Sequence, residues 1–134
     1  RKVYSLGDET SAKPSFSILI YPVISMDEAI THQGSKNNLL GISPSKEKVA
    51  KFSDETQVDN ATPKTFLVHA TDDKSVPVEN SIHYYLALKD HKIPVEMHIY
   101  EKGGHGFGLG KESTSKFWIQ ACEKWLKSNA LIKI

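Results

Sequence analysis

The sequence has little of several features that would narrow its function. Among its 134 residues only Cys122 is a cysteine, which excludes an internal disulfide and a cysteine-based metal cluster. No apolar run approaches the roughly 20 residues that cross a membrane. The sequence also has almost no excess of charge of either sign, because 17 basic residues are interleaved with 16 acidic ones, for a net charge of +1. Nucleic-acid binders and proteins of anionic membranes usually carry a concentrated basic surface, so both roles are disfavoured.

Three short segments have the pattern of β-strands. The nearly continuous apolar runs at 16–21 and 65–70 are typical of strands buried on both faces of a parallel sheet. Residues 95–100 alternate between apolar and polar, which predicts a strand near a sheet edge with one face partly solvated. Residues 1–14 are polar and end at a proline, which predicts an N-terminal loop.

Helical patterns lie between and after these segments. Ser43 is expected to cap a short helix with Pro44 at its first position, and Val49 and Phe52 on its inner face. Pro77 opens a second helix. Its apolar stripe is expected to comprise Val78, Ile82, Tyr85, Leu86 and Lys89. A last helix, from about 115 to 128, is expected to bury Phe117, Trp118, Ala121, Cys122, Trp125 and Leu126.

The order strand, helices, strand, helix, strand, helix predicts an α/β fold. It implies a parallel sheet of about three strands with right-handed crossovers and flanking helices. The size of the chain fits one modest domain.

Two polar loops follow neighbouring strands of this sheet. Asp73 follows the strand at 65–70, and His105 follows the strand at 95–100 within a glycine-rich turn. The carboxyl ends of parallel strands meet at one edge of a sheet, where ligands gather. A carboxylate there could hold an imidazole in one tautomer while its other nitrogen takes a proton from a serine hydroxyl. Asp73 and His105 are therefore predicted to be the acid and the base of a serine-hydrolase triad.

Other polar residues have plainer interpretations. Asp72 stands beside Asp73, and the sequence leaves open which of the two is the acid. His69, at the end of a buried strand, is expected to be structural. The remaining histidines match no zinc motif, so no metal and no cofactor is predicted. The sequence contains no Gly-x-Ser-x-Gly. The serines considered as substitute nucleophiles do not lie on elbow-type turns; they are Ser25, Ser35 and Ser81.

The chain resembles the C-terminal half of an α/β-hydrolase, most of all bacterial esterases of the acetyl-xylan-esterase and lipase-like group. The acid loop of that family reads His-Gly-x-x-Asp-x-x-Val-Pro, which maps its acid onto Asp73 and places Ala70 where the family usually has glycine. The likeness is carried by residues 16–25, 34–41, 69–77 and 100–107.

The resemblance implies a three-layer α/β-hydrolase-like fold, with residues 1–134 as the C-terminal portion of a single domain. The nucleophile and oxyanion hole of that family lie upstream of the strand matching 16–21. We therefore expect that the nucleophile half is missing here and that this chain is inactive by itself.

The implied function is that of a serine carboxylic ester hydrolase, which deacetylates small or sugar acetyl esters. One alternative is a fragment of a prolyl-oligopeptidase-type serine peptidase, which shares the acid and histidine loops and differs upstream. Another is a catalytically inactive remnant that acts through association.

The expected partners follow from the same features. A small acyl ester or an acetylated carbohydrate is the expected substrate, and neither nucleic acid nor membrane is expected to bind. The apolar strand at 16–21 would be left without an upstream neighbour, and bare apolar edge strands associate. We expect it to pair with a missing N-terminal half or to self-associate. The compartment stays open, since any signal peptide would precede residue 1.

Overall fold

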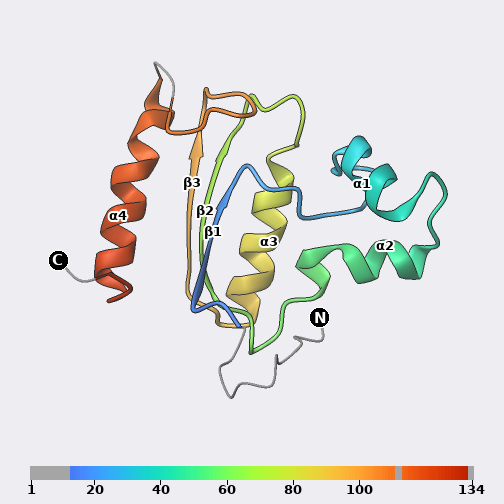
Figure 1. Ribbon diagram of the computed structural model, residues 1–134, viewed down its shortest axis with the longest axis horizontal. Helices are drawn as coiled ribbons and strands as arrows, with labels where there is room; N and C mark the ends of the chain where they lie inside the picture. Colours follow the sequence, from blue (N-terminus) through green and yellow to red (C-terminus); the bar gives the residue numbers. More distant parts are fainter. Residues whose placement is uncertain (1–12, 111–112, 133–134) are drawn as a thin grey trace.

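The computed structural model describes residues 13–110 and 113–132, which form a three-layer α/β arrangement. Its parallel sheet has the strand order β1 (Phe16–Ile20), β2 (Lys64–Ala70), β3 (Val95–Tyr100). Helix α4 (Trp118–Ser128) covers one face and α3 (Glu79–Asp90) the other, with α1 (Gln33–Leu40) and α2 (Lys46–Phe52) beyond α3 (Figure 1). The described residues thus confirm the predicted parallel sheet with flanking helices.

The register of the sheet brings two loops together. Ala70, the last residue of β2, pairs with Tyr100, the last residue of β3. The Thr71 amide continues the ladder by donating to the Tyr100 carbonyl at 2.8 Å. The chain therefore leaves both strands at the same level, and the loops that carry Asp73 and His105 start side by side.

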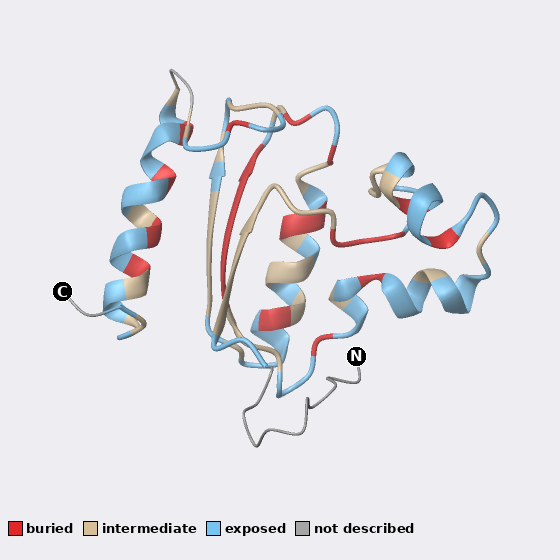
Figure 2. Cartoon of the chain, viewed as in Figure 1, coloured by how far each residue is buried: buried red, intermediate tan, exposed pale blue. Residues whose placement is uncertain are grey.

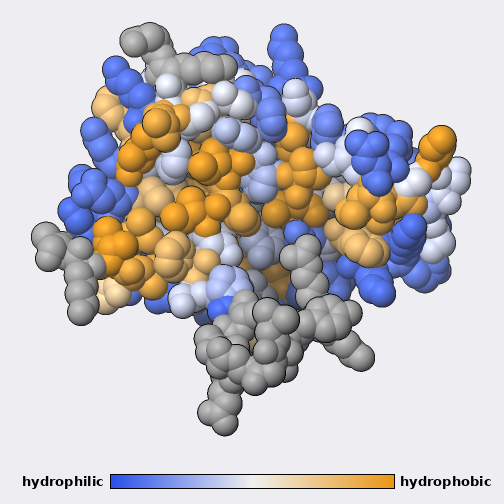
Figure 3. Space-filling model, viewed as in Figure 1, coloured by the Kyte–Doolittle hydropathy of each residue, from blue (hydrophilic) through white to orange (hydrophobic). Residues whose placement is uncertain are grey.

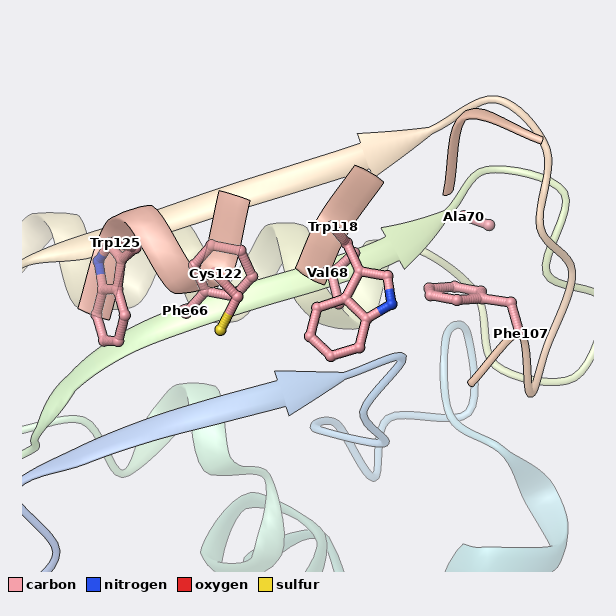
Figure 4. Packing of buried hydrophobic residues seen from close by; sticks show 7 residues of the cluster. All are labelled: Phe66, Val68, Ala70, Phe107, Trp118, Cys122 and Trp125. Atoms are coloured by element: carbon pink, nitrogen blue, oxygen red, sulfur yellow. The ribbon is translucent and has the colours of Figure 1, made fainter. Parts of the chain in front are cut away.

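A hydrophobic cluster fixes α4 to the sheet (Figure 4). Burying one such large apolar side chain contributes roughly 1.5–3 kcal/mol. The Trp118 indole N–H also donates to the Gly108 carbonyl at 2.9 Å. One member, Phe107, comes from the loop after β3, so the core itself anchors the chain two residues beyond His105. The cluster consists of Phe66, Val68, Ala70, Phe107, Trp118, Cys122 and Trp125.

The three strands differ in burial (Figure 2). Strand β2 is buried along nearly all its length and β3 lies at a sheet edge, as predicted. The prediction that the first strand is buried on both faces is wrong for the described residues, since every residue of β1 is only half-buried. The reason is its place: among the described residues β1 pairs with β2 alone.

Two helix predictions are corrected. Helix α2 is capped by Ser45, whose hydroxyl accepts from the Lys48 amide at 3.3 Å, and not by Ser43 with Pro44 at the first position. No residue of α2 is buried, and Phe52, expected on its inner face, is 38% exposed. In α3 the expected apolar stripe is displaced, because Leu86 is 46% exposed. The buried residues of α3 are Asn80, Ser81 and Leu88.

The prediction for the last helix is confirmed for its two tryptophans and Cys122, which are all buried. Phe117 is an exception at 48% exposed. It ends the 3₁₀ turn η2 (Thr114–Phe117), whose tighter winding turns it away from the α4 stripe. Of the predicted loop at 1–14, residues 1–12 lie outside the described residues.

Candidate active site

The Asp73 carboxylate is fully buried and fully hydrogen-bonded. Strand β2 ends at Ala70, whose carbonyl accepts from the Asp73 amide at 3.2 Å and starts a tight turn. The Oδ1 atom of Asp73 then accepts from the Ser75 and Val76 amides, each at 2.9 Å. The Oδ2 atom faces two imidazoles and lies 2.8 Å from Nδ1 of His105. A buried charge needs such compensation, and here each oxygen receives two bonds.

The hydrogen bonds keep Asp73 ionised. Burial alone raises the pKa of this carboxyl. The Val76 amide, the His105 ring and the Ser75 amide lower it by more, so the pKa lies below the ordinary 3.8. Near neutral pH the group is a carboxylate, and its only role toward the His105 ring is that of an acceptor.

His105 is oriented by Asp73 and is partly exposed to solvent. Its side chain is 39% exposed, whereas that of Asp73 is 0% exposed. Because Asp73 is an acceptor, Nδ1 of His105 carries a hydrogen, and Nε2 is the ring nitrogen that Asp73 leaves available. The Tyr21 ring packs edge-on against the imidazole, with centroids 4.8 Å apart, and against Phe107 at 4.9 Å. Tyr21 reaches this position with φ +40°, a costly conformation for a residue with a side chain.

His69 lies beneath Asp73, and its hydrogen bonds favour one tautomer. The Val76 carbonyl lies 3.0 Å from Nε2, so this nitrogen must carry a hydrogen, which it also shares with Asp73 Oδ2 at 3.2 Å. Nδ1 then accepts from the Ser81 hydroxyl at 2.8 Å. Burial lowers the pKa of His69 by more than Val76 and Asp73 raise it, which favours the neutral ring.

The two neighbouring aspartates have different contacts. Asp72 does not bind the imidazole: its Oδ1 accepts from the backbone amides of Gly103 at 2.9 Å and Gly104 at 2.7 Å. The pKa of Asp72 lies below its ordinary value, chiefly because the Gly104 amide donates a hydrogen bond to the carboxylate. Desolvation raises the pKa, and the hydrogen bond from the Gly103 amide lowers it further. The geometry thus brings Asp73, and not Asp72, against His105.

Asn80 is a buried site residue that the sequence did not reveal. It is 0% exposed, and its Oδ1 accepts from the Ile24 amide at 3.0 Å and the Ser25 amide at 2.9 Å. Its Nδ2 donates to the Pro77 carbonyl at 3.0 Å. Asn80 therefore ties the chain after β1 to the acid loop. The sequence offered only a polar pair, Asn80 and Ser81, in the first turn of the helix and off its expected apolar stripe.

The serines considered in the sequence bond away from His105. Ser81 donates to His69, the Ser25 hydroxyl accepts from the Asp27 amide at 3.1 Å, and Ser35 bonds to His32. Within residues 13–110 and 113–132, no group of three His, Cys, Asp or Glu residues could hold a metal ion. No described helix is long and apolar enough to span a bilayer.

Solved structures with a similar fold define the class. The chain superimposes on an acetyl ester-xyloside bifunctional hydrolase from Caldicellulosiruptor lactoaceticus with a TM-score of 0.85 and 45% sequence identity, over 90% of this chain and 44% of that one. It superimposes on the carboxylesterase Cest-2923 from Lactobacillus plantarum with a TM-score of 0.76 and 23% identity, over 95% of this chain and 49% of that one. The chain has part of an α/β-hydrolase fold.

Within that class, the model of the prolyl oligopeptidase family matches residues 16–131, and the chain belongs to this family. It is 39% identical over 133 residues to an acetylxylan esterase from Xylanibacter ruminicola, covering 94% of this chain and 27% of that protein. It is 36% identical over 110 residues to endo-1,4-beta-xylanase B from Butyrivibrio fibrisolvens, covering 82% and 17%. The chain thus spans less than a third of the length of these curated relatives.

Proposed function

We propose that this chain supplies the acid, Asp73, and the base, His105, of a serine esterase. The observation that carries the proposal is the 2.8 Å contact between a fully buried carboxylate and Nδ1 of a partly exposed imidazole. Such a pair needs a serine hydroxyl at Nε2. The 134 residues contain no Gly-x-Ser-x-Gly, so we assign the serine to a polypeptide segment outside them.

The pair can serve both halves of ester hydrolysis. Nε2 of His105 takes the serine proton as the serine oxygen bonds to the acyl carbon, and then gives that proton to the departing alcohol. The resulting acyl-serine is cleaved when His105 takes a proton from water, whose oxygen attacks the same carbon. The proton returns to the serine oxygen as the acid is released. Asp73 stabilises the imidazolium in each half, without itself taking the proton.

Acetyl esters of small molecules or of sugars are the proposed substrates. The support comes from relatives: an acetyl ester-xyloside hydrolase is 45% identical and an acetylxylan esterase 39% identical. The acid and the base fit this chemistry, since the leaving group is an alcohol that one imidazole can protonate.

A serine peptidase is the second candidate. The family whose model matches residues 16–131 is named after a peptidase, prolyl oligopeptidase. An Asp–His pair serves amide and ester cleavage alike. The two candidates differ in the groups that bind the substrate, so substrate preference distinguishes them.

The edge of β1, which no other strand covers among the described residues, supports a proposal about partners. Figure 3 shows apolar residues gathered over the middle of the face on which Figure 1 places β1. We propose that a strand of the nucleophile-bearing segment pairs with this edge, and that copies of the isolated chain associate through it in the absence of that segment.

The test uses the protein expressed from its complete gene. We expect it to hydrolyse p-nitrophenyl acetate and acetylated xylo-oligosaccharides, with prolyl p-nitroanilide peptides cleaved far more slowly. His105→Ala should abolish this activity, whereas His83→Ala, at an exposed position of α3, should not. Equal ester hydrolysis by the His105→Ala variant would refute the proposal. Faster cleavage of peptides than of esters would select the peptidase.

A further inference from the structure

We infer that Asp72 is a positioning residue for His105: its carboxylate holds the backbone of the turn before the histidine against the acid loop. The inference rests on the proposed function of the Asp73–His105 pair. It gives neighbouring carboxylates separate tasks, one on the imidazole ring and one on the backbone that carries it. The sequence alone left these roles undivided.

The residues around His105 place few restrictions on the backbone conformation of their loop. Residues 101–110 contain five glycines, and all but Gly103 have positive φ, from +54° at Gly108 to +111° at Gly110. Glycine loses more conformational freedom on folding than any other residue. A loop of this composition therefore depends on contacts from outside for a single arrangement.

Those contacts hold the loop on both sides of His105. Downstream, Phe107 is buried in the core and the Gly108 carbonyl accepts from Trp118 at 2.9 Å. Upstream, the amides of Gly103 and Gly104 both donate to Asp72 Oδ1. The second of these amides belongs to the residue immediately before His105.

The upstream contact comes from the acid loop itself. Asp72 and Asp73 are joined by one peptide bond, and the Asp73 amide is fixed to the Ala70 carbonyl at 3.2 Å. The position of the acid and the position of the histidine backbone are therefore set by the same short turn. Without Asp72, the histidine could keep its anchor at Phe107 but lose the constraint that aligns Nδ1 with Asp73 Oδ2.

The consequence for catalysis is a loss of rate without a loss of binding. A displacement of about 1 Å in a catalytic group can cost about 100-fold in rate. We expect Asp72→Ala, in the protein from the complete gene, to lower kcat by about 10- to 100-fold with KM little changed. Asp72→Asn keeps an oxygen that can accept both amide bonds, so it should recover most of that loss. Asp90→Ala, at the exposed end of α3, is the matched control and should change neither constant.

Hydrogen exchange of the chain provides a readout that does not need activity. In Asp72→Ala the amides of Gly103 and Gly104 should exchange at least tenfold faster, while the Trp118 indole N–H stays protected. In Asp72→Asn most of their protection should remain.

The possible results separate the two proposals. If the unaltered protein hydrolyses no ester, the proposed function fails, and the exchange rates still decide whether Asp72 holds the turn. If it does hydrolyse esters, unchanged kcat and unchanged exchange in Asp72→Ala would overturn the inference. An Asp72→Asn variant as slow as Asp72→Ala, with both folded by circular dichroism, would also overturn it.

Discussion

Asp73 accepts four hydrogen bonds, and only one of them comes from the proposed base. Two come from backbone amides in its own turn and the fourth from His69, at 3.2 Å. His69 is buried, neutral and fixed between Ser81 and Val76. The Asp73 carboxylate is therefore held in place by groups of the chain itself, which is the condition for the preorganised site that we propose.

The buried neutral His69 predicts a pH dependence of stability. Its folded-state pKa lies below the ordinary 6.5, so the unfolded chain binds the proton more readily. The contribution of neutral His69 to the free energy of unfolding is present above pH 6.5. This contribution is lost as the pH falls from 6.5 toward the folded-state pKa. The free energy of unfolding then falls by at most about 1.4 kcal/mol per pH unit because of this one group. The groups facing this ring are Asp73, His105, Ser81 and the Val76 carbonyl.

Chemical denaturation of the chain between pH 7.5 and 5 measures this effect. In His69→Gln the part of the pH dependence due to His69 should disappear, so the free energy of unfolding falls less steeply on acidification. His83→Gln, at an exposed position of the same region, should leave the slope of the unaltered chain. Parallel curves for His69→Gln and the unaltered chain would contradict a buried neutral His69.

The sequence predicted some of the contacts in the candidate site and could not predict others. The Asp73–His105 pairing followed from two strand ends in one parallel sheet, and the structure brings the two side chains together. The division of tasks between Asp72 and Asp73 could not follow, because one peptide bond separates them and only the turn geometry decides which carboxylate points at the ring. Asn80 was missed for a similar reason, since the Ile24 and Ser25 amides that donate to its side chain lie 56 and 55 residues away along the chain.

At the scale of elements, the end of β2 and the loop after β3 are fitted to each other. A Cβ added at Gly103 would lie 3.0 Å from the Ala70 Cβ and 3.1 Å from Phe107. Ala70 stands where the resembled esterases usually have glycine, and its φ is not positive, so alanine is tolerated there. The loop accommodates the Ala70 methyl group because residue 103 has none.

This fit predicts a coupled pair of substitutions. Gly103→Ala should destabilise the chain by about 1–3 kcal/mol through overpacking. Ala70→Gly in the same chain should recover part of the loss, because it removes the closer of the two contacts. Urea denaturation of the single and double variants gives the coupling free energy.

Gly104→Ala is the matched control for this coupling. Its φ of +62° makes alanine costly by about 1–2 kcal/mol, but no atom lies within 4 Å of the added Cβ. Ala70→Gly should therefore give no recovery there. Equal recovery at positions 103 and 104, or none at either, would contradict the proposed contact.

Element types were more predictable than the faces that the elements bury. Continuous apolar runs and period-two alternation identified all three strands, because backbone geometry sets those periods. The prediction of which face of α3 is buried was partly wrong. Asn80 and Ser81 are buried and hydrogen-bonded, and a hydropathy pattern does not reveal such polar burial. Phe117 was misplaced because the sequence did not show the 3₁₀ turn that precedes α4.

At the scale of the whole molecule, the sheet has an unpaired edge in the part of the chain that the structure describes. The side chains of β1 are apolar at four of five positions and only half-buried. Edge strands of this kind recruit a further strand or another copy.

The proposed pairing at β1 predicts the behaviour of the 134-residue chain in solution. Light scattering after gel filtration should show self-association that increases with protein concentration. The protein from the complete gene should be less prone to it, because a strand of the nucleophile-bearing segment would occupy the edge. A 134-residue chain that stays a monodisperse monomer at every protein concentration would contradict the proposal.

The central claim is that buried Asp73 orients His105 for catalysis, and kcat/KM of Asp73→Asn in the protein from the complete gene tests it most directly. An amide removes the negative charge and can force the imidazole into the wrong tautomer, so ester hydrolysis should fall by about 10⁴-fold. Asp90→Asn should have no effect. A folded Asp73→Asn protein that keeps a tenth or more of the unaltered kcat/KM would show that Asp73 is not the acid of this site.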